Sequence, residues 1–520
     1  MSKFDCFNKF SHGFLLGVFS LILAVSIGRA QDKPNWIVIM ADDLGYGDLS
    51  CYGATELQTP NIDRLAAEGL RFTSGYCSAS TCTPTRFSTL TGTYAFRKKG
   101  TGIAPPNGKL TISPDTPTLA DLAKSAGYQT AVIGKWHLGL GGPKGPNWNG
   151  EIKPGPLEIG FDHAFLLPTT NDRVPQVYLE DHRVVGLDPA DPLWVGNKKP
   201  AGDHPTGVSH RNTLRMDWSH GHNETIHNGI SRIGYYTGGH AARFRDEDLA
   251  DEWVRRSAAW IEKNRKHPFF LFFASHDLHV PRMPHERFQG KSKLGPRGDS
   301  ILQLDWCVGE LVKTLERLGL EENTLIVFCS DNGPVMDDGY ADEALEKLGS
   351  HRAAGPFRGG KYSVFEGGTR TPWITRWKGR IKPGVSDEMV CTIDLAASFA
   401  AMTDTVLPDR GFLDSFDVSD AMLGVADAKG RGHLIQQDNG QSGNFGFREG
   451  KWKLTRHDSG FAFNSVVEKP LARSAVPKFM LFDLESDPNE SKNIIESHPE
   501  MAGDMIRSLE GYIKVGRSRP

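Results

Sequence analysis

The 520-residue sequence has few cysteines, no excess of either charge and no long apolar run after its first thirty residues. Seven cysteines are too few for a disulfide-built scaffold in a chain of this length. The balance of 60 Lys and Arg against 63 Asp and Glu leaves no basic tract for nucleic acid, so any anionic ligand must be held by a local cluster of cations. No segment after residue 30 is apolar enough to span a bilayer, and no internal repeat is visible.

The apolar segment at the N-terminus has the pattern of a secretory signal peptide. Lys3 and Lys9 precede the apolar run 14–27, and Gly28-Arg29-Ala30 forms a small-x-small ending. An N-terminal membrane anchor is the alternative, but the run is shorter than the ~20 residues of a membrane span. We therefore expect residues 1–30 to be removed and the mature chain to be exported to the periplasm or secreted.

Strands and helices alternate through the middle of the chain, which is typical of a doubly wound α/β sheet. Buried strands are predicted at residues 35–40, 129–133, 269–274 and 324–329, and helices at residues 60–69, 118–127 and 302–318. The stretch 141–250 is rich in Gly, Pro and His and is predicted to form long loops over a site. The main domain is predicted to cover residues 31–428.

The texture changes at about residue 430. Short β-like runs at 433–437, 446–448, 451–456 and 479–484 are followed by a helical pattern at 501–512. We predict a smaller α+β subdomain over residues 429–520.

Polar side chains follow the ends of all four predicted strands: Asp42 and Asp43, then Lys135 and His137, then His276 and His279, and finally Asp331 and Asn332. Ligand sites of open α/β sheets lie outside the carboxyl ends of the strands, so these residues are expected to form one site. The oxygen donors Asp42, Asp43, Asp331 and Asn332 favour Ca²⁺ or Mg²⁺ over zinc. Each motif by itself also fits a turn or a cap. Gly359-Gly360-Lys361 could bind a phosphate or sulfate group, or be a flexible turn.

Cys82 begins the stretch CTPTRFSTLTG and differs from the other cysteines, most of which lie in apolar surroundings. Pro84 suits the first turn of a helix, and Arg86 lies on the same helix face as Cys82. A thiol at a helix N-terminus is expected to have a lowered pKa and to be a nucleophile. An exposed thiolate in an oxidising compartment is open to oxidation, however, which argues against a bare catalytic cysteine. Whether Cys51 and Cys77 form a disulfide is left open.

The pattern Cys82-Thr83-Pro84-Thr85-Arg86, followed by Leu90-Thr91-Gly92, resembles the signature of the type I sulfatases of the alkaline-phosphatase superfamily. Further similar motifs occur in the same order at Asp42-Asp43, 59–63, 134–139, 279–281, 330–333, Gly360-Lys361 and 366–368. Thr85 is a small departure, since serine or alanine is commoner there. The resemblance implies an α/β/α sandwich with a large mixed sheet, plus a smaller C-terminal subdomain with a short antiparallel sheet.

The resemblance also implies a cofactor and a modified residue. A formylglycine-generating or maturation enzyme would convert Cys82 to Cα-formylglycine (3-oxoalanine), whose hydrate is the nucleophile. Ca²⁺ would be bound by Asp42, Asp43, Asp331 and Asn332, with residue 82 completing the set. Arg86 is implied to orient the hydrate, and Lys135 and Lys361 to bind sulfate. His137 is implied to help break down the sulfated intermediate and His279 to lie beside the leaving oxygen, while His276 is expected only to support the site.

The segment 168–185 and the pair His351-Arg352 are similar to those of bacterial carbohydrate sulfatases, especially enzymes acting on 6-sulfated galactose or N-acetylgalactosamine. Asn171, Asp172, Arg173, His351 and Arg352 are therefore candidates for binding sugar hydroxyls, although ordinary loop polarity explains them equally well. Three alternatives stay open. They are a phosphodiesterase or phosphonate monoester hydrolase of the same superfamily, a non-catalytic binder of sulfated glycans, and a thiol hydrolase using Cys82 with His137 or His279.

Overall fold

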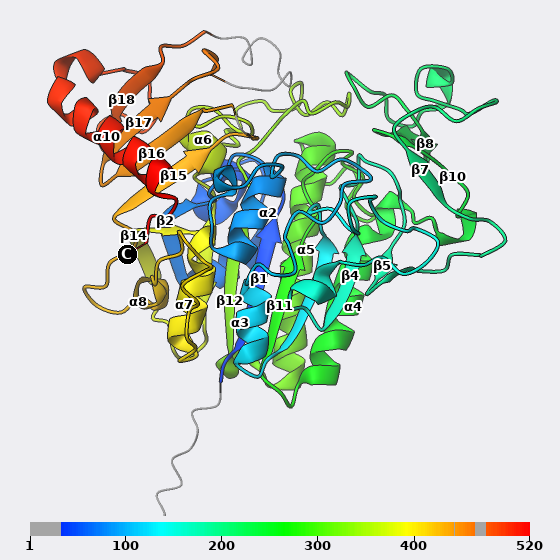
Figure 1. The fold of residues 1–520 in the computed structure, drawn as a ribbon, viewed down its shortest axis with the longest axis horizontal. Coiled ribbons are helices and arrows are strands. Elements are labelled where there is room, and N and C mark those ends of the chain that lie inside the picture. The colour runs from blue at the N-terminus through cyan, green and yellow to red at the C-terminus, as the bar shows by residue number, and fades with distance from the viewer. Residues whose placement is uncertain (1–32, 441, 463–474, 520) are drawn as a thin grey trace, which may run out of the picture.

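A large mixed sheet forms the centre of the computed structural model, which describes residues 33–440, 442–462 and 475–519 (Figure 1). The predicted signal peptide lies outside these residues. From edge to edge, the sheet consists of β14 (Gly384–Cys391), β2 (Leu70–Tyr76), β13 (Trp373–Arg376), β12 (Thr324–Ser330), β1 (Asn35–Ala41), β11 (Phe269–Ala274), β3 (Gln129–Lys135), β4 (His163–Leu167), β5 (Leu179–Glu180) and β6 (Arg183–Val184). The four predicted strands β12, β1, β11 and β3 are confirmed, and they are parallel neighbours at its centre.

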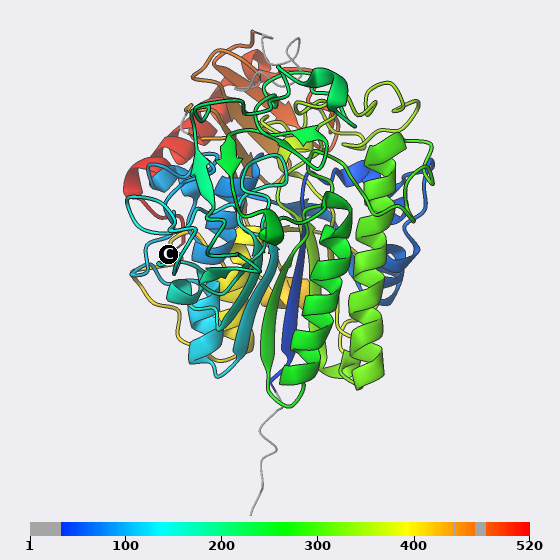
Figure 2. The same cartoon turned by 90° about the vertical axis from the view of Figure 1, so that its right-hand side faces the viewer.

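Helices cover both faces of the sheet because its central strands are apolar on both sides. In β1, Trp36, Val38 and Met40 face one core, whereas Ile37 and Ile39 face the other. The first core is covered by α2 (Cys82–Thr91), α3 (Leu119–Ser125) and α7 (Leu395–Met402), and the second by α1 (Pro60–Glu68), α4 (Leu249–Asn264) and α5 (Gly295–Leu318). Figure 2 shows cyan α3 on one side of the strands and green α4 and α5 on the other. The expected α/β/α sandwich is confirmed.

The C-terminal residues form a second, antiparallel sheet of β15 (His433–Gln437), β16 (Phe445–Glu449), β17 (Trp452–Arg456) and β18 (Phe479–Asp483), packed by α10 (Pro499–Val515). This confirms the predicted small α+β unit. The end of β15 contacts the segment that precedes Cys82: the Ser80 N–H donates to Gln437 O at 2.8 Å, and the Gln437 N–H donates to Ser78 O at 3.1 Å. The C-terminal sheet therefore lies against the start of α2.

Two sequence predictions differ from the structure. The stretch 141–250 is not only loop, because the apolar run of β4 pairs with β3 and extends the main sheet. Two small hairpins also form there, β7 (Trp194–Gly196) with β10 (Tyr235–Thr237) and β8 (Ile226–His227) with β9 (Ile230–Ser231). Helix α5 begins at Gly295 and not at residue 302, since its N-terminal glycines weaken the helical pattern.

The structure also answers the question about Cys51 and Cys77 that the sequence leaves open. Cys51 and Cys77 are both free thiols, so the disulfide that the sequence left open is not formed. Within the described residues no helix has the length and apolarity needed to cross a membrane.

Candidate active site

The carboxyl ends of β1 and β12 bring four acidic and amide side chains into contact. Asp42 and Asp43 follow β1, and Asp331 and Asn332 follow β12; all four are fully buried. The Asn332 amide donates to Asp43 Oδ1 at 2.7 Å, and the Asp43 N–H donates to Asp331 Oδ1 at 3.4 Å. The structure thus places together the residues that the sequence grouped as metal ligands.

Two buried cations neutralise this cluster from other elements. Arg86 extends from α2, where its Nε donates to Asp331 Oδ2 at 2.9 Å and its second guanidinium nitrogen to Asp42 Oδ2 at 3.3 Å. Lys135 at the end of β3 donates to the same oxygen of Asp42. The residue before it must be glycine, since a Cβ at Gly134 would lie 1.9 Å from Ala274 O on β11. Gly134 therefore allows β3 to pack closely against β11, and Lys135 lies at the carboxyl end of β3.

A third buried cation comes from the loop before α6 (Glu366–Thr369). The Lys361 ammonium donates to Asp43 Oδ2 at 2.9 Å and to Asp338 Oδ2 at 2.8 Å. The Tyr362 hydroxyl donates to Asp338 Oδ1 at 3.2 Å. Asp338 is therefore a second carboxylate partner that fixes the lysine.

The cluster fits a divalent cation. Asp42 Oδ1 and Asn332 Oδ1 are buried oxygens without a hydrogen-bond partner. Burial and the neighbouring Asp331 raise the pKa of Asp42 to about 7, even though cations contact it. Ligand atoms of Asp42, Asp43 and His279 lie within 4.8 Å of one another. Unsatisfied oxygen donors of this kind are what a hard cation such as Ca²⁺ or Mg²⁺ binds.

Cys82 lies at the first position of α2, enclosed among these charges. Its side chain is 2% exposed, and its Sγ lies 3.1 Å from His137 Nδ1. Burial raises the pKa of the Cys82 thiol to about 11, although Lys135 and Lys361 act to lower it. The prediction of a lowered thiol pKa at this helix N-terminus is wrong, because desolvation outweighs the nearby positive charge.

The hydrogen bonds of the two histidines define which ring nitrogen is available to a reacting group. His137 Nε2 lies 3.2 Å from Ala104 O, and a carbonyl only accepts, so Nδ1 is the acceptor that faces Cys82. His279 Nδ1 donates to Val280 O at 2.8 Å, which leaves its Nε2 as the acceptor. Burial, with Lys135, lowers the pKa of both rings well below the usual value, so both are neutral.

The candidate sugar-binding residues lie in two places. The Asn171 amide donates to His279 O at 3.1 Å and to Pro281 O at 3.0 Å. Asp172 pairs with Arg173 at 2.8 Å, and one of its oxygens lies 4.0 Å from His279 Nδ1. The segment 171–173 is therefore brought to the catalytic residues.

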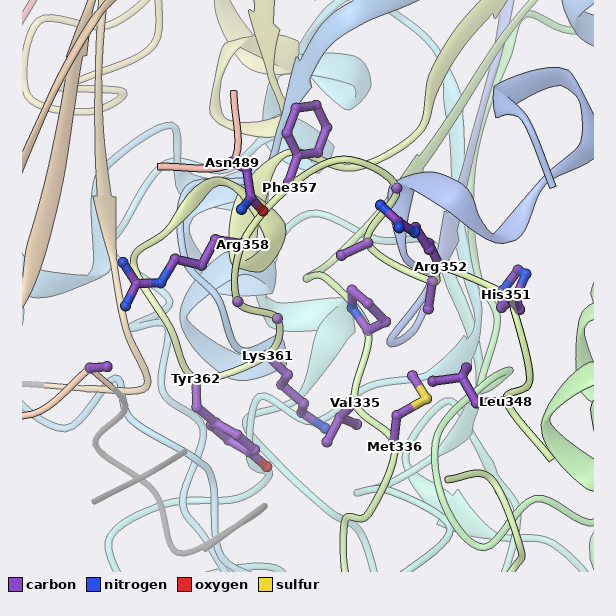
Figure 3. Close-up of a pocket in the computed structure, with 17 residues that line it drawn as sticks. Val335, Met336, Leu348, His351, Arg352, Phe357, Arg358, Lys361, Tyr362 and Asn489 are labelled. Carbon is purple, nitrogen blue, oxygen red and sulfur yellow. The ribbon is translucent and has the colours of Figure 1, made fainter. Parts of the chain in front are cut away.

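His351 and Arg352 lie in a different segment, and both line a cleft that Lys361 also lines. His351 is buried, and its Nε2 donates to Asp48 Oδ1 at 2.8 Å, an oxygen that Arg297 also binds. Arg352 is exposed and lines a cleft of about 440 Å³ together with Lys361 and Met336 (Figure 3). Their binding to sugar stays a prediction. His276 accepts a hydrogen bond from Trp253 Nε1 at 3.1 Å, so it packs against α4.

Sequence reasoning missed Asp338, Tyr362 and His222. His222 Nε2 lies 3.0 Å from Asp172 Oδ2, and Asp338 binds Lys361 as described. Asp338 and His222 sit in irregular segments without periodicity, so no sequence signal separated them from ordinary loop polarity. Tyr362, directly after Lys361, was the nearest to a detectable candidate.

Comparison with known proteins agrees with this geometry. The sulfatase family matches residues 34–405. The chain is 46% identical over 483 residues to an N-acetylgalactosamine-6-O-sulfatase of Bacteroides thetaiotaomicron, covering 93% of this chain and 94% of that protein. It is 32% identical over 501 residues to human arylsulfatase A, covering 94% and 89% of the two chains.

A solved structure from Bacteroides thetaiotaomicron, described under metabolism of multiple glycosaminoglycans, superposes with a TM-score of 0.89 at 45% identity, covering 93% of this chain and all of that one. A phosphonate monoester hydrolase of Agrobacterium radiobacter, at 16% identity and a TM-score of 0.56, shares the fold alone. By family match and by identity over nearly its whole length, the chain belongs to the sulfatase family and is a sulfuric ester hydrolase.

Proposed function

We propose that the protein hydrolyses sulfate monoesters of carbohydrates, and that its substrates are 6-sulfated galactose or N-acetylgalactosamine units of a sulfated glycan. The observation that carries the reaction type is the convergence of residue 82, two buried lysines and two neutral histidines at one edge of the sheet. The sugar is supported by the 46% identity to a protein named N-acetylgalactosamine-6-O-sulfatase.

Residue 82 acts in this proposal as Cα-formylglycine, made from Cys82 by a maturation enzyme. Its hydrated aldehyde supplies the hydroxyl nucleophile and, after sulfate transfer, a second hydroxyl whose deprotonation releases sulfate. The raised pKa of the buried Cys82 thiol supports conversion, because a protonated thiol is a weak nucleophile at neutral pH. The same observation disfavours the alternative of a plain thiol hydrolase.

His137 and His279 divide the proton transfers. His137 Nδ1 is an acceptor 3.1 Å from the side chain of residue 82, which suits it to take the proton that expels sulfate. His279 faces the leaving oxygen through Nε2. Burial and two lysines hold its pKa down, and a bound sulfate ester offsets the charge of those lysines, which favours a proton on Nε2 for the leaving group.

The cations hold the sulfuryl group. Lys135 and Lys361 exchange part of their contact with Asp42 and Asp43 for sulfuryl oxygens, and Arg86 keeps the acidic cluster in place. These fixed charges in a buried site stabilise the transition state more strongly than charges in water. Asp42, Asp43, Asp331 and Asn332 would hold Ca²⁺, and the bound ion would supply Lewis-acid polarisation and positive charge.

Further parts of the proposal concern processing. Residues 1–30 are a signal peptide that directs export to the periplasm or the exterior, which brings the enzyme to a glycan substrate. The catalytic domain is assigned to residues 31–428 and the C-terminal subdomain to residues 429–520, a boundary supported by the separate second sheet.

The test is sulfate release from matched sugars. The purified enzyme is incubated with N-acetylgalactosamine 6-sulfate, galactose 6-sulfate, N-acetylgalactosamine 4-sulfate and N-acetylglucosamine 6-sulfate, with Cys82→Ala as control. We expect release from the first two at a rate at least tenfold above the others, because a buried polar contact to a sugar hydroxyl discriminates by about that factor or more. Faster cleavage of an aryl phosphodiester, or glycan binding without turnover, would contradict the proposal.

A further inference from the structure

Glu490 belongs to the C-terminal part of the chain, yet it contacts the loop that carries Lys361. We define the Lys361 loop as residues 358–367. Its two ends meet at a neck, where the Gly367 N–H donates to Arg358 O at 2.8 Å. A Cβ at position 367 would lie 2.6 Å from that carbonyl oxygen, so the closed neck requires glycine. This hydrogen bond therefore closes the loop at the neck, and Lys361 lies within the closed loop.

Glu490 accepts a hydrogen bond from each side of this neck. Its Oε2 accepts the Glu366 N–H at 2.6 Å, and its main-chain carbonyl accepts a hydrogen bond from the Arg358 guanidinium at 3.1 Å. Glu490 and Glu366 are both 0% exposed, so water cannot replace the contact between them. The side chain and the backbone of one residue therefore hold the entry and the exit of the Lys361 loop.

Lys453 of the C-terminal sheet contacts both Glu366 and Glu490. Lys453 on β17 donates to Glu366 Oε1 at 2.7 Å, and its ammonium lies 3.8 Å from Glu490 Oε1. Both of these partners are as deeply buried as Glu490 itself. Burial raises the pKa of Glu490 to about 8, with Lys453 opposing and Glu366 adding to the shift. Glutamine has the same shape as this side chain and keeps an acceptor oxygen for the Glu366 N–H.

The loop in turn determines where the Lys361 ammonium lies. The ammonium donates to Asp43 Oδ2 at 2.9 Å and to Asp338 Oδ2 at 2.8 Å, so a small shift of the loop would break one of these contacts. The Lys361 N–H also donates to Pro334 O at 2.9 Å, and the Tyr362 N–H donates to Ser80 O at 2.8 Å. The segment around Lys361 is therefore fixed to the catalytic domain, and the neck of the loop is fixed by Glu490.

We propose that Glu490 is a positioning residue for the sulfatase reaction: by holding the neck of the Lys361 loop closed, it determines the position of the Lys361 ammonium relative to the sulfuryl group. This inference rests on the proposed function, in which Lys361 binds sulfate. Glu490 lies outside residues 34–405, the part that the family match covers, so the C-terminal subdomain contributes to sulfate binding without touching the substrate.

A double-mutant cycle on the full-length, matured enzyme tests the inference. The variants are Glu490→Ala, Glu490→Gln, Lys361→Ala and the double alanine variant, each measured for kcat and KM on a sulfate ester. The matched control is Glu485→Ala, whose side chain lies in the same subdomain and is 76% exposed. A displaced catalytic group costs up to about 100-fold in rate, so we expect Glu490→Ala to lower kcat/KM by about 10- to 100-fold.

The conservative variant and the double variant separate positioning from general support. Glu490→Gln keeps the acceptor and is expected to stay within about threefold of the wild type, as is Glu485→Ala. In the Lys361→Ala background, Glu490→Ala is expected to cost no more than about twofold, because its route to the substrate is already gone. Wild-type kinetics of Glu490→Ala, or an equal loss in both backgrounds, would overturn the inference.

A second variant covers the case in which Glu490→Ala does not fold. Arg358→Met removes the other contact to the neck and leaves the buried carboxyl group in place. It is expected to lower kcat/KM in the wild-type background and not in the Lys361→Ala background; full activity of Arg358→Met in such a case overturns the inference. Wild-type turnover by Lys361→Ala contradicts the role of Lys361 in the proposed function itself, and the Glu490 inference falls with it. Unchanged kinetics of the Glu490 variants alone leaves the proposed function standing.

Discussion

Replacing Arg86 by methionine removes the guanidinium that neutralises the acidic cluster from α2. Arg86 is 1% exposed and binds Asp331 Oδ2 at 2.9 Å, Lys135 O at 2.9 Å and Asp42 Oδ2 at 3.3 Å. Lys135 still contacts Asp42 in the variant, but Asp331 Oδ2 loses its cation. Removing one member of a buried ion pair costs about 3–5 kcal/mol, because a buried charge is left without compensation. We expect a loss of that size in the free energy of unfolding.

The assay is urea unfolding of the wild type and of Arg86→Met, in EDTA and again in Ca²⁺. Because a bound cation supplies part of the missing positive charge, the loss should be smaller in Ca²⁺ than in EDTA. The matched control is Arg255→Met on α4, whose side chain is 60% exposed and pairs with Glu252 at 2.5 Å. Exposed pairs contribute about 0–1 kcal/mol, so this variant should be close to the wild type. Equal stability of Arg86→Met and Arg255→Met in EDTA would show that Arg86 does not stabilise the buried acidic cluster.

Three further predictions follow from the site and the core. Cys82→Ala should abolish sulfate release while its unfolding midpoint stays near that of the wild type, because the side chain that it removes is small and uncharged; residual turnover above a few per cent would argue against residue 82 as nucleophile. EDTA should lower both sulfate release and the unfolding midpoint, and Ca²⁺ at 100 times its Kd should restore about 2.7 kcal/mol; unchanged midpoints would argue against a metal at Asp42. Burial lowers the pKa of His433 to about 4, so the unfolded state binds a proton first as the pH falls below ~6.5, and up to about 3 kcal/mol of stability is lost toward pH 4. His433→Phe, which keeps a ring stacked on Tyr512, should make unfolding less dependent on pH in this range, and a variant with the wild-type pH dependence would contradict the assignment.

The central part of the site was predictable because it depends on local patterns. Each apolar strand ends in a polar motif, and parallel neighbours bring those motifs to one edge, so Asp42, Asp331 and Lys135 could be grouped from the sequence. The start of α2 at Cys82 also followed from Pro84. These inferences need only the direction of each strand and the position of each helix end.

The remainder depends on burial and on contacts between distant segments. The helix N-terminus suggested an activated thiol, but burial raises the pKa of Cys82, and no sequence pattern reports burial of this kind. Asp338 meets Lys361 only because two loops fold together. Glu490 contacts Glu366, which lies 124 positions earlier in the chain. The sequence around Glu490 has the polar pattern of an ordinary surface turn. Similarly, the five residues of β4 lie in a Gly- and Pro-rich stretch, a composition that predicts loop and not strand.

The mass of the tryptic peptide 72–86 shows whether residue 82 is formylglycine in the active enzyme, because this peptide contains both Cys77 and Cys82. Cys77 is buried and free, so it serves as an internal reference for an unconverted cysteine. The peptide from active enzyme is denatured, alkylated with iodoacetamide and weighed. We expect one alkylated cysteine at position 77 and, at position 82, a residue in which H₂S has been exchanged for oxygen. Two alkylated cysteines in enzyme that releases sulfate at full rate would contradict it.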